Sequence, residues 1–257
     1  MDSRDELHAS SHWKHWGALG AGWGTQARFD PAEWAGSPLI AITSPQRWRV
    51  LSAFPEAIEV SRRMGLAFTQ DTVRQLCSVE LLSEYFRPGS SVLTIGDGFG
   101  VLGGLIRKRF PRCRISMVDL SFTLREQEDR LTRAFGRENF DFVHADDLDQ
   151  LGEQKFDVAV NVASMQEMDP PEVARYFSFM RGGGRVDLFY CCNRENKILP
   201  DGTVSAFKDY PWSPADEIIV DGVCPWHQFF VSVRFPFIRR YDGVHLHRLV
   251  RLAAQPA

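Results

Sequence analysis

A glycine-rich loop followed by spaced acidic residues is the part of the sequence best suited to chemistry. Gly96, Gly98 and Gly100 follow the apolar run 91–95, and Asp97 lies between the first two glycines. Glycine lets the backbone turn sharply and approach a ligand closely. Asp119 ends the next apolar run. A carboxylate there can accept charge-assisted hydrogen bonds from a pair of hydroxyls, such as those of a ribose.

The elements that must position these residues alternate between strands and helices. Apolar runs predict strands over 91–95, 114–118, 140–144, 156–162 and 185–191, with helices between most of them. Such alternation predicts a doubly wound, mostly parallel α/β sheet of the Rossmann-like kind. Ligands of these sheets bind at the carboxyl ends of the strands, where the glycine loop and Asp119 fall.

The two ends of the chain depart from the alternation. At the C-terminus, strand-like runs at 228–235 and 244–252 are separated by Pro236 and the turn residues 241–243, which predicts an antiparallel hairpin at the end of the sheet. At the N-terminus, a helix is predicted over 68–86. We therefore divide the chain into a mostly helical cap, 1–86, and a second domain, 87–257.

The first fifth of the chain is rich in tryptophan. Two interpretations stay open: these rings form a lid or a homodimer contact, or they pack onto the main domain, since aromatic side chains dominate cores. Five of the seven tryptophans lie there: Trp13, Trp16, Trp23, Trp34 and Trp48.

Composition and charge exclude several classes of protein. A net charge of −3 gives no broad attraction to nucleic acid or to an anionic membrane. No run of 18 apolar residues and no signal peptide are visible, so we expect a cytoplasmic protein. The five cysteines are odd in number and lack a C-x-x-C pair, which disfavours a disulfide framework and a structural zinc site.

The segment 95–100 resembles the glycine motif of class I methyltransferases that use S-adenosylmethionine (SAM). A dinucleotide fold is the competing interpretation, because Gly98, Gly100 and Gly103 match G-x-G-x-x-G. In that fold the first glycine follows the strand directly. Counted from Gly96, the third glycine position is Val101, so the methyltransferase register fits better.

The resemblance implies a role for each matching residue. Gly96, Asp97, Gly98 and Gly100 would lie beside the methionine part of SAM. Asp119, followed by Leu120, would bind the ribose, Asp146 and Asp147 the adenine, and Asn161 would lie near the cofactor. The family has an acid two residues before the first glycine, where this chain has Thr94. Asp97 is the candidate to replace that acid.

Later segments resemble sugar O-methyltransferases of bacterial natural-product pathways. They are 161–169, 190–194, 209–212 and 224–228. The resemblance implies methylation of a hydroxyl on a small molecule, a sugar or a sugar-bearing metabolite. A hydroxyl needs a general base, for which Glu167 and His227 are the candidates. The candidate acceptor-binding residues are Gln166, Asn193, Asp209, Tyr210 and Trp212.

Other functions stay open beside this one. An N-methyltransferase for an amino sugar or amino acid would need less base. A SAM-binding partner protein without catalysis would fit the missing acid at Thr94. Nucleic-acid methylation is disfavoured because no N/D-P-P-Y/F motif follows the fourth strand. We interpret His245 and His247 as structural residues rather than metal ligands. Because the resemblance assigns Asp146 and Asp147 to the adenine, we expect no metal.

Overall fold

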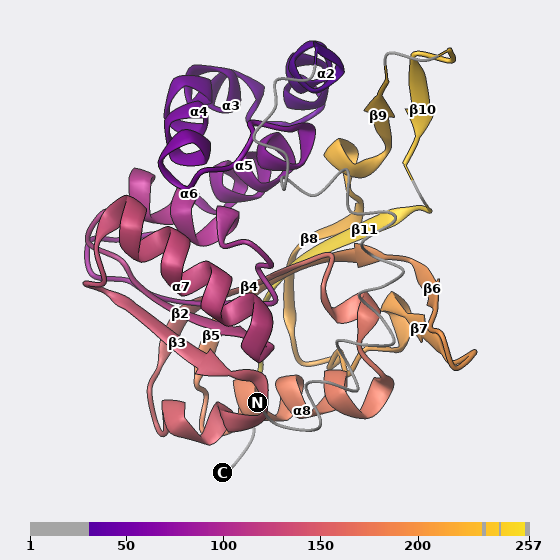
Figure 1. The fold of residues 1–257 in the computed structure, drawn as a ribbon. Coiled ribbons are helices and arrows are strands. Elements are labelled where there is room, and N and C mark those ends of the chain that lie inside the picture. The colour runs from indigo at the N-terminus through magenta and orange to yellow at the C-terminus, as the bar shows by residue number, and fades with distance from the viewer. Residues whose placement is uncertain (1–30, 233–234, 242, 255–257) are drawn as a thin grey trace.

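A computed structural model of the chain describes residues 31–232, 235–241 and 243–254. The predictions made for Trp13, Trp16 and Trp23 lie outside these residues. Figure 1 shows a central sheet with helices on both sides. The N-terminal helices form a cluster on one of these two sides. The predicted helix over 68–86 is present as α5, Gln70–Leu82.

The central sheet has seven strands in the order β3-β2-β1-β4-β5-β11-β8. The strands β1 to β5 are parallel to one another, whereas β11 is antiparallel to both β5 and β8. This confirms the predicted mostly parallel α/β sheet with an antiparallel end. The strands of this sheet are β1 (Ser91–Ile95), β2 (Arg114–Asp119), β3 (Phe140–His144), β4 (Phe156–Val162), β5 (Val186–Arg194), β8 (Glu217–Val223) and β11 (His245–Arg251).

The helices form two layers around the sheet. One hydrophobic core joins α4, α5, α6 and α7 to one face, and a second core joins α8 and the turn η2 to the other. Because β1, β2, β4 and β5 run parallel, their carboxyl ends lie at one common edge of the sheet. The helices are α2 (Pro31–Ala41), α3 (Arg47–Ser52), α4 (Phe54–Arg63), α5, α6 (Val101–Arg109), α7 (Ser121–Phe135) and α8 (Pro170–Arg181), with short 3-10 turns η2 (Ala145–Leu151), η3 (Met165–Glu167), η4 (Phe207–Asp209) and η5 (Pro225–His227).

The pairing predicted for the C-terminal hairpin is wrong. The antiparallel partners of β11 are β5 and β8. The predicted run 228–235 instead contributes β9 (Phe229–Val231) to a separate ribbon with β10 (Ile238–Arg240). The strand β8 escapes prediction because it lies at the sheet edge with most of its side chains exposed or half-buried. Its sequence therefore lacks a clear alternation. A further small ribbon pairs β6 (Asn196–Ile198) with β7 (Val204–Ala206).

A side-chain amide joins the N-terminal helices to the β9–β10 ribbon. Gln70 Nε2 donates to Val231 O at 2.9 Å, and Gln70 Oε1 accepts from Val231 N–H at 2.8 Å. The amide thus completes the hydrogen bonds that a neighbouring strand would make. Gly36 of α2 allows this approach, since a Cβ there would lie 2.6 Å from Gln70 Cδ.

Candidate cofactor and acceptor site

The loop after β1 turns on three glycines with left-handed backbones. Gly96, Gly98 and Gly100 have φ values of 68°, 65° and 80°, a region that side chains disfavour. A Cβ on Gly96 would overlap Ser164 Oγ and lie 2.5 Å from Ser164 Cβ. At Gly98, by contrast, no described atom lies within 4 Å of such a Cβ. The loop is therefore packed on one side and open on the other.

Asp119 lies at the end of β2 with its carboxylate turned to this loop. Its Oδ2 accepts from Gly98 N–H at 3.1 Å and from Gln127 Nε2 at 2.7 Å, and its Oδ1 accepts from Leu120 N–H at 2.9 Å. Burial raises the pKa of Asp119 to about 6, although these hydrogen bonds act to lower it. The carboxylate is thus fixed in position, and its second oxygen keeps a lone pair for a ligand.

Gln127 on α7 is a site residue that sequence patterns do not reveal. Its buried Nε2 donates both to Asp119 Oδ2 and to Gly98 O, the latter at 2.8 Å. This amide holds the glycine loop against the carboxylate. A glutamine in a helix carries no sequence signal for such a role, because the contact depends on how α7 packs.

Asp97, which the sequence offers as a replacement for the missing acid at Thr94, has its carboxylate turned toward α6. Asp97 Oδ1 accepts from Leu102 N–H at 3.0 Å and Oδ2 from Gly103 N–H at 2.7 Å, so its carboxylate caps the first turn of α6. Burial raises the pKa of Asp97 to about 7. Thr94 Oγ1 is buried and has no hydrogen-bond partner among the described residues.

The segment predicted to meet the adenine lies at the surface after β3. Asp146 and Asp147 are exposed at the start of η2, and His144 Nδ1 accepts from Asp146 N–H at 3.2 Å. Leu120, beside Asp119, is 38% exposed, which leaves an apolar surface at the same edge of the sheet. These residues follow the carboxyl ends of β2 and β3, at the same edge of the sheet as the glycine loop.

Buried amides lock the ends of β1, β4 and β5 together. Asn161 Nδ2 donates to Ile95 O at 2.8 Å, and its Oδ1 accepts from Asn193 Nδ2 at 2.7 Å. Asn193 Oδ1 in turn accepts from Gln166 N–H at 3.1 Å, and Gln166 Oε1 accepts from Arg194 N–H at 2.7 Å. The structure therefore brings three predicted site residues together as one network. Their amides mostly bind one another and the backbone, which gives the network a positioning role.

Strained backbone follows β4 directly. Ala163 has a φ of 58°, in the left-handed region that residues with a Cβ rarely adopt, and its N–H donates to Cys192 O at 2.8 Å. This conformation places Ser164 against Gly96. No sequence signal predicts it, because alanine is not a residue that favours positive φ.

Glu167 ends the short turn η3 beside the amide network. Its carboxylate accepts from Gln166 Nε2 at 3.2 Å and pairs with Lys197 Nζ at 3.1 Å. The Glu167 side chain is 22% exposed.

His227 lies deeper, between two thiols. Its Nδ1 is 3.3 Å from Cys224 Sγ and 3.6 Å from Cys192 Sγ, and its ring lies beside that of His245 with centroids 5.0 Å apart. Burial, helped by His245 and Arg74, lowers the pKa of His227 well below its usual range. Its imidazole is therefore neutral at pH 7 and a weak base.

The remaining predicted acceptor residues lie mainly in packing positions. Tyr210 is buried in the core beneath α8, and Trp212 stacks at 28° on Phe189. The guanidinium of Arg248 lies 4.7 Å from the Trp212 ring centroid. Asp209 is exposed on η4.

Comparisons with known proteins bear on the fold. No protein-family model matches the chain, and no curated protein sequence matches it. A proposed sarcosine dimethylglycine methyltransferase from Galdieria sulphuraria aligns with 73% of this chain and 87% of its own, at 10% identity and a TM-score of 0.53. The chain has a Rossmann-like methyltransferase fold.

Two further solved structures are less similar overall. The mitomycin 7-O-methyltransferase MmcR aligns with 88% of this chain and 74% of its own, at 13% identity and a TM-score of 0.47. A cyclopropane-fatty-acyl-phospholipid synthase-like protein from Lactobacillus casei has 19% identity and a TM-score of 0.41, and this chain spans only 51% of its length.

Within the described residues, no helix has the length and apolarity needed to cross a membrane.

Proposed function

We propose that the protein is a SAM-dependent methyltransferase acting on a hydroxyl of a small molecule, a sugar or a sugar-bearing metabolite. One observation carries the proposal: the Asp119 carboxylate, at the end of β2, is held by Gly98 N–H and Gln127 beside a glycine loop in which no described atom lies within 4 Å of a Cβ built on Gly98. The methyltransferase fold supports it, since ligands bind at this edge of such sheets.

The residues present fit the cofactor at most positions. Asp119 would accept hydrogen bonds from the ribose hydroxyls, and Gly98 would let the backbone approach the ligand. Leu120 and the segment at Asp146 and Asp147 would border the adenine. SAM, when bound, supplies a methyl group on a positively charged sulfur. Thr94 departs from the pattern, and its unpartnered hydroxyl would face the ligand's amino end as a neutral acceptor.

We assign the role of general base to Glu167 instead of His227. Glu167 lies at the end of η3, close to the carboxyl end of β4, and is partly exposed. From there it would accept the proton of the acceptor hydroxyl, while Lys197 orients its carboxylate. His227 is less suited, because its Nδ1 lies against two thiols and its lowered pKa makes it a weak base.

The amide network would position the acceptor side of the site. Gln166 and Asn193 fix the turn that carries Glu167 relative to β5. Reacting groups held in line contribute about 7–11 kcal/mol to such displacements, so a shift of this turn would cost activity.

The test has two parts. Binding of S-adenosylhomocysteine, measured by calorimetry on the wild-type chain, checks the cofactor site without any acceptor. Transfer of a labelled methyl group from SAM to a panel of sugars, amino sugars and amino acids then checks the reaction. Binding without transfer to any hydroxyl or amine would favour a non-catalytic SAM-binding protein, and absence of binding would refute the proposal.

A Glu167→Gln variant separates the enzymatic alternatives. Removing a general base lowers kcat by about 10²–10⁴-fold, while the dissociation constant for S-adenosylhomocysteine should stay unchanged. An amine acceptor, which needs less base, would show a much smaller loss. Glu153→Gln, at an exposed position just before β4, is the matched control and should retain full activity.

A further inference from the structure

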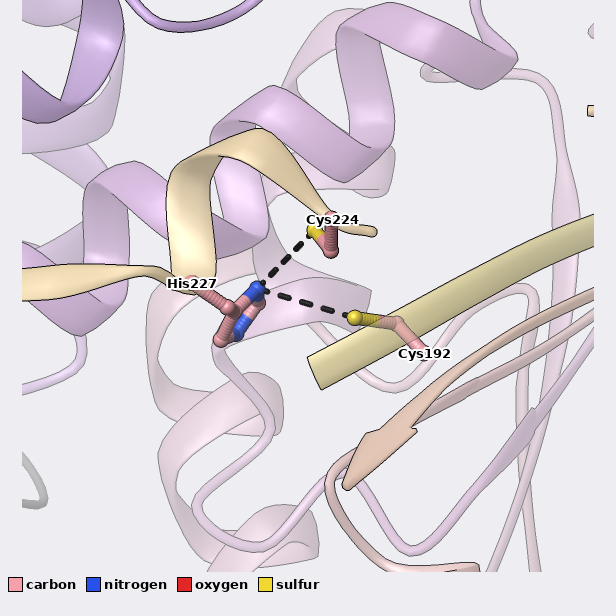
Figure 2. A group of neighbouring side chains, drawn as sticks. All are labelled: Cys192, Cys224 and His227. Carbon is pink, nitrogen blue, oxygen red and sulfur yellow. Dashed lines mark hydrogen bonds between the residues drawn. The ribbon is translucent and has the colours of Figure 1, made fainter. Parts of the chain in front are cut away.

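Two cysteines and a histidine from separate segments converge in the interior beside β5. Figure 2 shows His227 Nδ1 facing both Cys224 Sγ, at 3.3 Å, and Cys192 Sγ, at 3.6 Å. The three potential ligand atoms all lie within 4.8 Å of one another, and all three residues are buried. The side chains of the cluster contact one another and, within the described residues, make no hydrogen bond to the glycine loop or Asp119, so the proposed cofactor site does not use them.

The spacing of these atoms is that of ligands around one small ion. Zinc binds cysteine sulfur at about 2.3 Å and histidine nitrogen at about 2.0–2.1 Å in tetrahedral geometry. With those bond lengths, sulfur and nitrogen on the same ion lie about 3.6 Å apart. The two observed distances from His227 Nδ1 are close to this value, and a tetrahedral ion would fit with small adjustments.

The local fold holds the ligands in place without an ion. Cys224 and His227 lie at the two ends of the turn η5, where Cys224 N–H donates to His245 O at 2.8 Å. Arg74 of α5 fixes the same turn, since its Nε donates to Trp226 O at 3.1 Å. Cys192 is held by the pairing of β5 with β4 and β11. A preorganised donor set of this kind binds a metal at little conformational cost.

We propose that Cys192, Cys224 and His227 form a zinc-binding site that ties the turn η5 to the central sheet. Thiolate and imidazole are the donors that select zinc among the common divalent ions. Two thiolates would balance the charge of Zn²⁺, so the buried site would be neutral overall. Three protein ligands leave the fourth tetrahedral position for water or another ligand.

The amino-acid sequence shows little sign of this site. Cys192 is 35 residues before His227, and only the C-x-x-H spacing of Cys224 and His227 is local. The spacing rules that disfavour a structural zinc site apply to ligands from neighbouring positions. Here one ligand comes from a strand and two from a turn, so only the tertiary fold brings them together.

Metal content of the purified full chain tests the proposal. The chain, expressed with added zinc and dialysed, should hold about one zinc per chain by plasma mass spectrometry. Changes even in the outer shell of a zinc site weaken binding about 10–100-fold, so Cys192→Ser, Cys224→Ser and His227→Asn should each weaken it about 100-fold or more. Cys191→Ser is the matched control, because Cys191 is equally buried but packs in the opposite core.

A second measurement does not depend on how the variants fold. Wild-type protein stripped of metal and titrated with Co²⁺ should show the strong absorption of cobalt–thiolate bonds, saturating at one ion per chain. Absence of that absorption, zinc content no higher than in a metal-free blank, or zinc content in all three variants equal to that of the wild type would overturn the proposal. So would a Cys192–Cys224 disulfide in freshly purified protein. Neither measurement uses SAM, so the result is independent of the proposed function.

Discussion

Replacing Asp119 by asparagine keeps the size of the side chain, removes one charge from the proposed ribose site and turns one of its two acceptor oxygens into an N–H donor. Hydrogen bonds to charged groups each contribute about 1.5–3 kcal/mol, and two ribose hydroxyls would bond to this carboxylate. The amide of the Asp119→Asn variant would keep one oxygen acceptor but lose the charge and the other acceptor. The binding free energy of S-adenosylhomocysteine should therefore fall by about 3 kcal/mol, which raises its dissociation constant about 150-fold.

Calorimetric titration with S-adenosylhomocysteine measures this change directly. Asp129→Asn is the control, because Asp129 lies on the exposed face of α7 in an ion pair with Arg133 and should bind as wild type does. Thermal unfolding of both variants checks that the fold is intact. An Asp119→Asn variant that is folded and binds within about threefold of wild type would refute the ribose assignment.

The same carboxylate makes binding depend on pH. Because burial raises the pKa of Asp119 to about 6, the group is protonated over more of the acidic range than an ordinary aspartate. The charged form is the one that binds the hydroxyls. Affinity for S-adenosylhomocysteine should therefore fall as pH is lowered through about 6 in wild type, and the Asp119→Asn variant should lack this step. Titrations on both sides of that pKa check it.

Two further predictions concern the glycine loop and a buried ion pair. Gly96→Ala should destabilise the fold by more than the about 1–2 kcal/mol of left-handed strain, because its Cβ would overlap Ser164. Gly98→Ala should lose only the stability that left-handed strain costs, but it should also lose S-adenosylhomocysteine affinity. Urea unfolding compares the stabilities of the two variants, and calorimetry compares their affinities. Equal stability of Gly96→Ala and Gly98→Ala would contradict the contact between Gly96 and Ser164. Asp216→Ala should cost about 3–5 kcal/mol in urea unfolding, since it leaves Arg181, which is 3% exposed, without its bidentate partner at 2.6 and 2.7 Å. A cost below about 1 kcal/mol would mean that water reaches this pair.

The predictable part of the fold is the part with strong periodicity. Buried parallel strands read as continuous apolar runs, so β1 to β5 are visible in the sequence, and so are the glycine loop and Asp119 at their ends. The strand β8 is not visible, because its apolar run, Ile218 to Val220, is only three residues long and lies between Glu217 and Asp221. The sequence pattern consequently favours a hairpin between β11 and the nearest apolar segment, 228–235. In the structure, that segment contributes to a separate ribbon.

The site is predictable where a residue's place follows from a strand end. Asp119 and Asn161 lie where expected because strand ends meet at one edge. The roles of Asp97, Gln127 and Tyr210 depend on how helices and loops pack, which local sequence does not specify. Asp97 lies in the expected loop, but its carboxylate turns to the amides of α6 because they are the nearest unsatisfied donors.

The bond between Gln70 and Val231 has a consequence for the order in which the chain folds. The two residues are 161 positions apart, yet their hydrogen bonds fix the N-terminal helices to the β9–β10 ribbon. During synthesis, α5 leaves the ribosome long before its partner exists, and closing so large a loop is entropically costly. The hydrogen bonds between Gln70 and Val231 can therefore form only after nearly the whole chain has been made. Until then, α5 is held by its packing against the neighbouring helices α2, α3, α4 and α6.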